Sequence, residues 1–193
     1  MDKNEDILYI EKFKSGDERA FEHLYKKYKR PILNYLYGVL SNRARAEELA
    51  QETLVKVYLN IQSYRPTGKF SSWVYAIARN LAKNEFRRQS HRKSVSIETK
   101  ITADGSLSLK DVLDDGSPDP GKILDNKDLR EQINDTLSEM PADYREVLVL
   151  CLIQGLSYKE ASKVLNCSCD AVAIRLHRAR KSFIKLVKGK LRS

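Results

Sequence analysis

The chain of 193 residues is basic (net charge +9), 41% hydrophobic and 32% charged, with only 5 proline and 8 glycine residues. Its length and composition describe one large or two small globular domains rich in helix-forming residues, and no segment alternates apolar and polar residues long enough to predict a sheet. Because no apolar run approaches the roughly 20 residues of a membrane span, and the amino terminus lacks the order of a signal peptide, we expect a cytoplasmic protein without membrane insertion.

The charge is unevenly distributed along the chain. Residues 1–93 contain 19 Lys and Arg against 11 Asp and Glu (+8), residues 94–140 contain 5 against 11 (−6), and residues 141–193 contain 11 against 4 (+7). Two basic blocks around an acidic segment are typical of two nucleic-acid-facing domains, joined by a segment that avoids DNA or occupies a basic channel.

Helical patterning begins near the amino terminus. We expect a first helix over residues 5–14, a second capped by Asp17 and kinked or split by Pro31, and a third over residues 43–63. The third has an apolar stripe made of Ala46, Leu49, Ala50, Leu54, Val57 and Ile61, and its exposed positions include Glu47, Glu48, Gln51 and Glu52. Such an acidic patch is usually only solvent-facing, but its contrast with the basic surroundings suggests a protein contact.

A fourth helix, over residues 70–89, carries the second basic feature. Tyr75, Arg79, Lys83 and Arg87 recur at four-residue spacing on an outer face, Asn80 lies on the neighbouring stripe, and the preceding loop contributes Tyr64, Arg65 and Lys69. Aromatic rings stack on unpaired bases while cations follow the phosphates, so this face suits single-stranded nucleic acid. The alternative is that Trp73 and Tyr75 are core aromatics, which is the commoner position for such residues on a helix.

The composition changes in the middle of the chain. Residues 94–122 are rich in Ser, Asp and Gly without a sustained helical period, so we expect a linker between a domain of residues 1–93 and a domain of residues 123–193. Helical patterning resumes over residues 123–140, and Pro141 ends it before the next helix. The expected fold class is therefore all-α, with two small helical domains joined by a flexible linker.

The second domain has the layout of a helix-turn-helix. After a helix over residues 144–152, Ser157 and Glu160 form a capping box that predicts a helix from Tyr158, and Ser168 is a good cap for a last helix. The apolar positions of that last helix are Val172, Leu176, Ala179, Phe183 and Leu186, and its basic positions are Arg175, Arg178, Lys181, Lys185 and Lys188.

Such a helix can lie in the DNA major groove, where counterion release favours its charges and its first turns reach base edges. A basic amphipathic helix can also be a solvated face, or a peptide-binding or membrane-surface segment. The turn spacing, the two caps and the preceding helix favour DNA binding.

The three cysteines, Cys151, Cys167 and Cys169, cannot form an even disulfide framework, which suits a reducing compartment. Cys167 and Cys169 raise the hypothesis of a redox sensor or a zinc site. A Cys-x-Cys pair is short of the usual four ligands, so turn and packing roles are the default. We expect no metal and no cofactor. An enzyme is not expected either, because the histidines are far apart in sequence and no nucleophile motif or glycine-rich phosphate loop is present.

Three motifs occur in order along nearly the whole chain: AEELAQETLVKVY, FSSWVYAIARNLAKNEFRR, and MPADYREVLVLCLIQGLSYKEASKVLNCS with RLHRAR after it. Together they resemble the RNA polymerase sigma factors of the sigma-70 family, specifically the two-domain extracytoplasmic function (ECF) subfamily. The last motif alone would indicate only a helix-turn-helix. The resemblance implies a transcription initiation factor that acts by binding and strand separation, without a catalytic group.

The resemblance also implies partners. Residues 47–57 would dock on the clamp helices of the largest subunit of core RNA polymerase, with Glu48, Gln51 and Glu52 as contacts, and the second domain would meet the flap of the second-largest subunit. The acidic linker would lie near the active-site channel and the RNA exit path. An anti-sigma factor, often membrane-bound in the family, would hold the protein inactive and could keep it at the membrane.

Two promoter elements are assigned by the same resemblance. The loop and the fourth helix would capture the minus-10 element and open the duplex by flipping a base of the non-template strand, through Tyr64, Arg65, Lys69, Trp73, Tyr75, Arg79, Asn80, Lys83 and Arg87. Residues 141–187 would read the minus-35 element as duplex DNA, through Ser168, Ile174, Arg175, His177, Arg178 and Lys181.

One stretch, Asp170 to Ile174, departs from the family pattern. Members usually have a small residue, a hydroxyl residue, Val, a basic residue and a hydroxyl residue there, whereas this chain has DAVAI. Two customary phosphate or base contacts are therefore missing, and Ile174 is left to touch a thymine methyl. Asp170 can cap the helix but repels phosphate, so we expect weaker minus-35 affinity or an unusual minus-35 sequence.

Two other classes of protein remain open. An ordinary repressor or activator would bind its operator unaided and would lack the acidic docking patch. An interaction protein that keeps the fold but has lost promoter function would fit Asp170 and Ala173.

Overall fold

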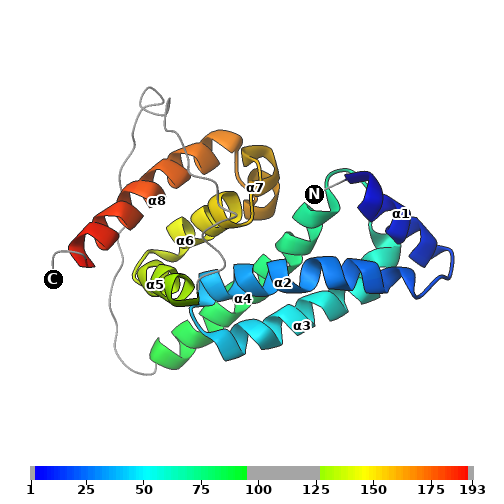
Figure 1. Cartoon of the computed structure of the whole chain (residues 1–193), viewed down its shortest axis with the longest axis horizontal. Coiled ribbons are helices and arrows are strands. Elements are labelled where there is room, and N and C mark those ends of the chain that lie inside the picture. Colours follow the sequence, from blue (N-terminus) through cyan, green and yellow to red (C-terminus); the bar gives the residue numbers. More distant parts are fainter. Residues whose placement is uncertain (1–2, 95–126, 191–193) are drawn as a thin grey trace.

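A computed structural model describes residues 3–94 and 127–190 of the chain, and every regular element within these two ranges is helical (Figure 1). The all-α expectation is therefore confirmed. The helices are α1 (Lys3–Lys14), α2 (Ala20–Leu40), α3 (Arg43–Asn60), α4 (Phe70–Ser94), α5 (Lys127–Ser138), α6 (Ala142–Leu148), α7 (Tyr158–Leu165) and α8 (Cys169–Lys190). Apart from Ser94, the expected linker of residues 94–122 lies outside the described residues, as does the expected helix start at residue 123.

The amino-terminal helices form a bundle around an α2–α3 hairpin. Ser41 ends α2 in the left-handed conformation (φ 53°), and the Asn42 side chain caps α3 by accepting a hydrogen bond from the Arg45 amide. Helix α4 packs against both members of the hairpin, and α1 packs against α2. The whole apolar stripe predicted for the third helix is buried, which fixes the face of α3 that meets the bundle.

Three local expectations for this bundle need correction. Helix α2 begins at Ala20, where Arg19 rather than Asp17 holds the cap position, although the Asp17 carboxylate accepts a hydrogen bond from the Arg19 amide (3.1 Å). Pro31 does not split α2, because the helix buries residues on both sides of the proline along its length and this packing compensates for one missing backbone hydrogen bond. The third helix stops at Asn60, and a 3₁₀ turn follows (Ile61–Ser63).

The carboxy-terminal helices form the predicted helix-turn-helix. Helix α7 begins at Tyr158 with both hydrogen bonds of the Ser157–Glu160 capping box, so this start is confirmed. Helix α8 begins after Ser168, whose hydroxyl oxygen accepts a hydrogen bond from the Ala171 amide (3.1 Å). The helix expected over residues 144–152 is α6, which starts slightly earlier and continues as a π-helical turn over Val149–Ile153.

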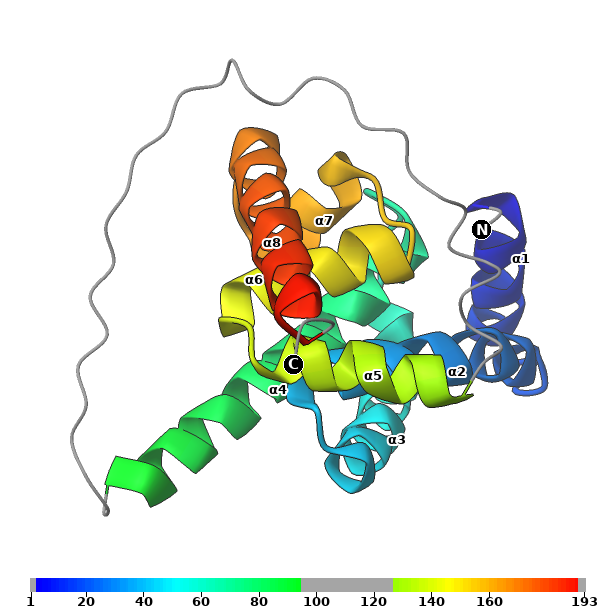
Figure 2. The same ribbon diagram turned by 60° about the vertical axis from the view of Figure 1, so that its left-hand side comes forward.

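The two groups of helices pack directly on each other. Helix α2 contacts α5, α6 and the π-helical turn, and α4 contacts α7 (Figure 2). The buried apolar residues of both groups of helices form one continuous core. At this junction the Arg145 guanidinium donates hydrogen bonds to the carbonyl oxygens of Val39 (2.6 Å), Ser138 (2.8 Å) and Met140 (3.0 Å). Those carbonyls lie at or near the ends of α2 and α5, where backbone acceptors lack helical partners and the helix dipole favours a cation. Arg145 therefore ties the two domains together.

Candidate nucleic-acid and polymerase interfaces

The loop before α4 is shaped by an aromatic cluster. The Tyr64 ring lies 5.1 Å from both the Phe70 and the Trp73 rings, and its hydroxyl donates to the Gly68 carbonyl (3.2 Å). The Lys14 ammonium group donates to the Tyr64 carbonyl (2.7 Å), which ties α1 to the loop. Tyr64 is buried and Trp73 half-buried, so both support the loop from within.

Tyr75 does not lie on an outer surface, in contrast to the sequence-based expectation. Its side chain is 1% exposed, its ring packs edge-on against Tyr35 with centroids 5.4 Å apart, and its hydroxyl donates to Gln154 Oε1 (2.8 Å). Burial raises the pKa of the Tyr75 phenol well above its ordinary value. The sequence placed Tyr75 on an outer face of α4, but Tyr35 of α2 and Gln154 of the carboxy-terminal domain cover its side chain, so for Tyr75 the alternative of a core aromatic holds.

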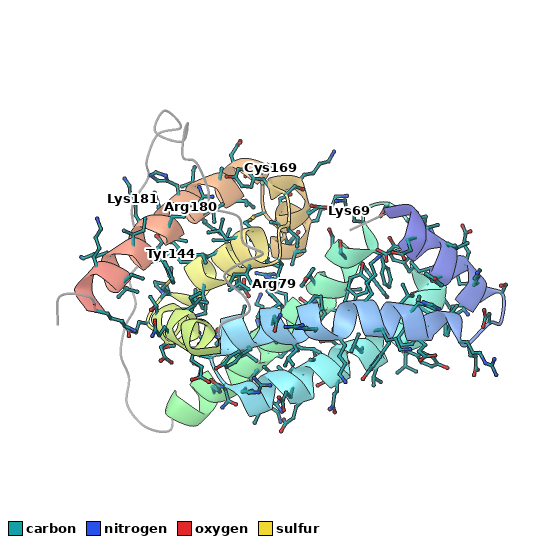
Figure 3. The ribbon with its side chains drawn as sticks, in the orientation of Figure 1. Lys69, Arg79, Tyr144, Cys169, Arg180 and Lys181 are labelled. Atoms are coloured by element: carbon teal, nitrogen blue, oxygen red, sulfur yellow. The ribbon has the colours of Figure 1, made fainter. Side chains whose placement is uncertain are left out.

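Two of the predicted phosphate-binding cations are paired with carboxylates of that domain. Lys69 Nζ lies 2.7 Å from Glu160 Oε1, and Arg79 Nε donates to Glu146 Oε2 (3.1 Å). In Figure 3, Lys69 lies beside α7, and Arg79 lies between α4 and α6. The remaining predicted polar residues of this surface are exposed: Arg65, Asn80, Lys83 and Arg87.

Burial disfavours the charged form of Glu146, the partner of Arg79. Burial raises the pKa of the Glu146 carboxyl, and the neighbouring Arg79 only partly opposes this rise. A buried charged pair often costs more in desolvation than its attraction returns. The Glu146–Arg79 pair therefore positions the two domains without contributing much stability at neutral pH.

Glu146→Gln tests this pairing. The pKa of the Glu146 carboxyl is higher in the folded than in the unfolded protein, so the folded state favours the protonated form. Protonated Glu146 therefore stabilises the fold fully below the ordinary pKa of 4.5, and this stabilisation is lost as pH rises through the raised pKa. We therefore expect the variant to be as stable as the wild type at neutral pH or up to about 1 kcal/mol more stable, with the difference growing from acidic to neutral pH. Thermal unfolding across this range measures it, with the exposed Glu131→Gln as control. A variant that is less stable by the same amount at every pH would contradict the expectation.

Helix α8 presents the predicted DNA-reading residues on one side of its first turns. Val172, Leu176 and Ala179 are buried, which directs the opposite face outward. The candidate residues on the accessible side are Ser168 and Lys181, which are exposed, and Ile174, Arg175, His177 and Arg178, which are half-buried. Figure 3 shows Lys181 on the outer side of α8 and Cys169 at its beginning.

The cysteines behave as packing and surface residues. Burial raises the pKa of Cys151 to about 11, with Arg180 opposing the rise, so its thiol is a poor nucleophile. Cys167 is half-buried, and Cys169 is exposed with its sulfur 3.6 Å from Ser162 Oγ. Within residues 3–94 and 127–190, no three His, Cys, Asp or Glu side chains converge as metal ligands.

The acidic patch of α3 is exposed, and exposed apolar residues that were not predicted continue the same surface. Glu48, Gln51 and Glu52 all face solvent, and Arg45 bridges Glu48 to Glu85 on α4 (Arg45 Nη2 to Glu85 Oε2, 2.8 Å). Val55 (56% exposed) and Leu59 (68% exposed) continue the same helical face. The sequence signal that could have identified Val55 and Leu59 is their helical spacing after Glu48 and Glu52, which places all four residues on one face of α3. A surface that mixes acidic and apolar side chains suits a protein partner better than DNA.

Two basic helical domains, one of them ending in an exposed helix-turn-helix, define a DNA-binding protein. Residues 24–92 match the Sigma-70 region 2 model, and residues 130–183 match the Sigma-70 region 4 model. The chain is 32% identical to the ECF RNA polymerase sigma factor SigW of Bacillus subtilis, over 91% of this chain and 93% of the relative. It is 30% identical to the RNA polymerase sigma-H factor of Pseudomonas aeruginosa, over 100% of this chain and 98% of the relative.

Solved structures show the same fold. CnrH in complex with the cytosolic domain of CnrY aligns with a TM-score of 0.69 at 21% identity, covering 96% of this chain and 98% of that chain. The sigma factor RpoE in complex with the anti-sigma factor NepR from Bartonella quintana aligns with a TM-score of 0.65 at 22% identity, covering 87% and 96%.

The chain belongs to the sigma-70 family of RNA polymerase sigma factors, in its ECF subfamily. This confirms the assignment made from the three sequence motifs. Sigma factors are transcription initiation factors and not enzymes. Across the described parts of the chain, no helix has both the length and the apolar character needed to cross a membrane.

Proposed function

We propose that this sigma factor binds core RNA polymerase in the cytoplasm and directs initiation from specific promoters. Its carboxy-terminal domain reads the minus-35 element as duplex DNA, and its amino-terminal domain captures the melted minus-10 strand. The observation that carries this proposal is the accessible side of the first turns of α8, which carries half-buried and exposed cations in a capped helix-turn-helix whose other face is buried. Groove-reading helices have this arrangement.

The residues that read the duplex lie on the accessible side of α8. Arg175 and Arg178 supply hydrogen-bond donors for guanine edges or phosphates, and His177 supplies a further polar group. Farther along the helix, Lys181 contacts a phosphate. Ser168 serves as cap and contact at the helix start, and Ile174 is the apolar contact. The exposed Asp170 stands beside them, which supports an altered minus-35 preference.

The loop at residues 62–69 and helix α4 capture the unpaired strand. Arg65, Lys69, Arg79, Lys83 and Arg87 follow the phosphates, and Asn80 contacts a base edge. Trp73 and Tyr75 are the aromatic residues assigned to base stacking, with Tyr64 supporting the loop beneath them. Because Tyr75 is buried against Tyr35 and Gln154, it can stack on a base only after the helices that cover it move away.

Polymerase docking falls on the exposed face of α3. Glu48, Gln51 and Glu52 contact the clamp helices of the largest subunit, and the neighbouring Val55 and Leu59 give this surface an apolar part. The carboxy-terminal domain contacts the flap of the second-largest subunit. Regulation by an anti-sigma factor is supported by the fold neighbour RpoE, which was solved in complex with the anti-sigma factor NepR.

Run-off transcription with core polymerase and a genomic promoter library tests the proposal, and Glu48→Lys tests the docking surface. Placing a cation in the acidic patch should reduce core binding and initiation at least tenfold, because like charges replace complementary ones at the interface. Glu22→Lys on α2 is a matched control, because Glu22 and Glu48 are both 62% exposed and each pairs with a cation of its own helix. Equal losses in both variants would argue against docking at α3. Stable core binding without initiation at any promoter would support the degenerate interaction protein instead.

A further inference from the structure

Asp170 lies on the face of α8 that the function proposed above directs toward DNA. Helical positions two residues apart lie about 160° from each other around the helix axis. Val172 is fully buried, so Asp170, two residues before it, and Ile174, two residues after it, both point away from the packed side. The same relation to the buried Ala179 places Lys181 on this face, as Figure 3 shows. The first outward position of the helix is therefore an exposed acid.

The Asp170 carboxylate has no hydrogen-bond or ion-pair partner within residues 3–94 and 127–190. The cap of α8 is Ser168, whose hydroxyl oxygen accepts a hydrogen bond from the Ala171 amide (3.1 Å). Within the helix, Asp170 gains only a weak attraction to the positive end of the helix dipole. Its carboxylate oxygens are therefore available to a ligand in the groove.

A carboxylate accepts hydrogen bonds and donates none, so it suits few groups in the major groove. Phosphates repel it, as do the acceptor atoms of guanine (O6, N7) and thymine (O4), and amino donors are offered only by cytosine N4 and adenine N6. The adenine amino group lies between two acceptors, its own N7 and O4 of the paired thymine. The cytosine amino group has an acceptor, O6 of the paired guanine, on one side only. Cytosine is therefore the base that best suits Asp170.

The neighbours of Asp170 support a contact with bases rather than with phosphates. Ile174 lies one turn farther along the same face and offers only apolar atoms, which suit a thymine methyl group. Arg175, three residues after Val172, lies nearer the packed side, where a cation meets the phosphates at the edge of the groove. The rise from Asp170 to Ile174 is about 6 Å along the helix axis, which corresponds to about two base-pair steps.

We propose that Asp170 determines the minus-35 specificity of this protein by accepting a hydrogen bond from the N4 amino group of a cytosine. This cytosine lies about two base pairs from a thymine whose methyl group contacts Ile174. The proposal rests on the duplex readout proposed above for α8. Asp170 acts by exclusion as well as by attraction, because guanine and thymine would place acceptor atoms against its carboxylate.

Sequencing of the promoters selected by the holoenzyme measures this preference. The full-length protein is assembled with core polymerase and binds duplex promoters in which the minus-35 element is randomised. We expect the wild type to enrich cytosine about tenfold over guanine and thymine at one position. Asp170→Asn should lose this preference at that position alone and favour adenine, because an amide accepts from N6 and donates to N7. A wild type without a cytosine position, or an unchanged profile of Asp170→Asn, would overturn the proposal.

Asp143→Asn is the matched control for charge and for position in a helix. Asp143 is exposed and, like Asp170, is the second residue of its helix. Both substitutions therefore remove a similar attraction to a helix dipole and should affect thermal unfolding to a similar extent. Only Asp170→Asn should change the base preference. Equal changes of preference in both variants would mean that Asp170 acts through net charge, which would overturn the proposal.

Modified bases identify the atoms in contact. N4-methylcytosine still pairs with guanine but carries a methyl group in place of the amino hydrogen that faces the major groove. At the selected position it should weaken the wild-type holoenzyme about tenfold in a competition assay at fixed salt, and Asp170→Asn less than about twofold. Equal weakening of both proteins would rule out the hydrogen bond to Asp170.

Deoxyuridine tests the Ile174 contact, because it lacks only the C5 methyl group of thymine. In place of the neighbouring thymine it should weaken the wild type roughly fourfold, the effect of one buried methyl group. Ile174→Ala should bind the two promoters equally. A wild type that does not distinguish deoxyuridine from thymine would refute the contact between Ile174 and a methyl group.

Run-off transcription separates this proposal from the function on which it rests. Initiation at specific promoters whose minus-35 element shows no cytosine preference would leave the sigma function standing and remove the role of Asp170. Selection of cytosine-containing duplex by a holoenzyme that initiates nowhere would support the Asp170 contact and remove the promoter function.

Discussion

Replacing Arg145 with alanine is expected to lower the free energy of unfolding by about 3 kcal/mol or more. Arg145 is 8% exposed, and its guanidinium donates to carbonyl oxygens at the ends of two helices: Val39 in the last turn of α2, Ser138 at the end of α5, and Met140 just after α5. Burial lowers the pKa of Arg145, but a guanidinium stays charged in proteins, so the cation is retained. Alanine would leave these carbonyl oxygens without their guanidinium donor, and α2 would lose its hydrogen bond to Arg145 of the carboxy-terminal domain.

Thermal and urea unfolding of Arg145→Ala measure this effect. Arg43→Ala is the control, because the Arg43 side chain is 70% exposed and pairs with Glu47 one turn along α3. The control should change stability by no more than about 0.5 kcal/mol. Similar losses in both variants would mean that the buried hydrogen bonds of Arg145 contribute no more than a surface ion pair.

Replacing Tyr75 with alanine should destabilise the protein by about 3 to 5 kcal/mol, because it removes a fully buried ring that packs on Tyr35. Tyr75→Phe keeps the ring and loses only the hydrogen bond to Gln154, which should cost about 1 kcal/mol. A transcription defect in the alanine variant alone would therefore not demonstrate base capture by Tyr75.

Circular dichroism melting of both variants, alongside run-off transcription, separates the two roles of Tyr75. Tyr25→Ala is a matched control, since Tyr25 is 36% exposed and contacts Lys29 through a cation–π interaction at the surface. It should change stability by less than about 1 kcal/mol. If Tyr75→Ala melts with the wild type, the buried position described for this ring is wrong.

Much of the fold followed from local sequence patterns. The capping box at Ser157, the cap at Ser168 and the apolar stripe of α3 were predicted and are present. Each depends on residues three or four apart, which a helix brings onto one face whatever else the chain does. Two local expectations met a different outcome: Asp17 does not hold the cap position of α2, and Pro31, where a kink or a split was expected, does not split the helix. Packing along α2 outweighs the local preference of the proline.

The candidate site was less predictable than the fold. Cations and aromatics at four-residue spacing on α4 were visible, but their partners Glu146, Gln154 and Glu160 were not. The chain separation from Arg79 to Glu146 is 67 residues, and from Tyr75 to Gln154 it is 79. No helical period relates residues so far apart.

By itself, therefore, the sequence determined the helices, their buried faces, the two basic blocks and the family, because hydrogen bonding, capping and hydrophobic period act over one or two turns. Only the tertiary structure decided that Tyr75 is buried and that Lys69 and Arg79 face carboxylates rather than solvent. Those outcomes depend on how the two domains pack across their junction. There the lack of a side chain at Gly38 lets Val149 approach α2, and Arg145 donates a hydrogen bond to the Val39 carbonyl.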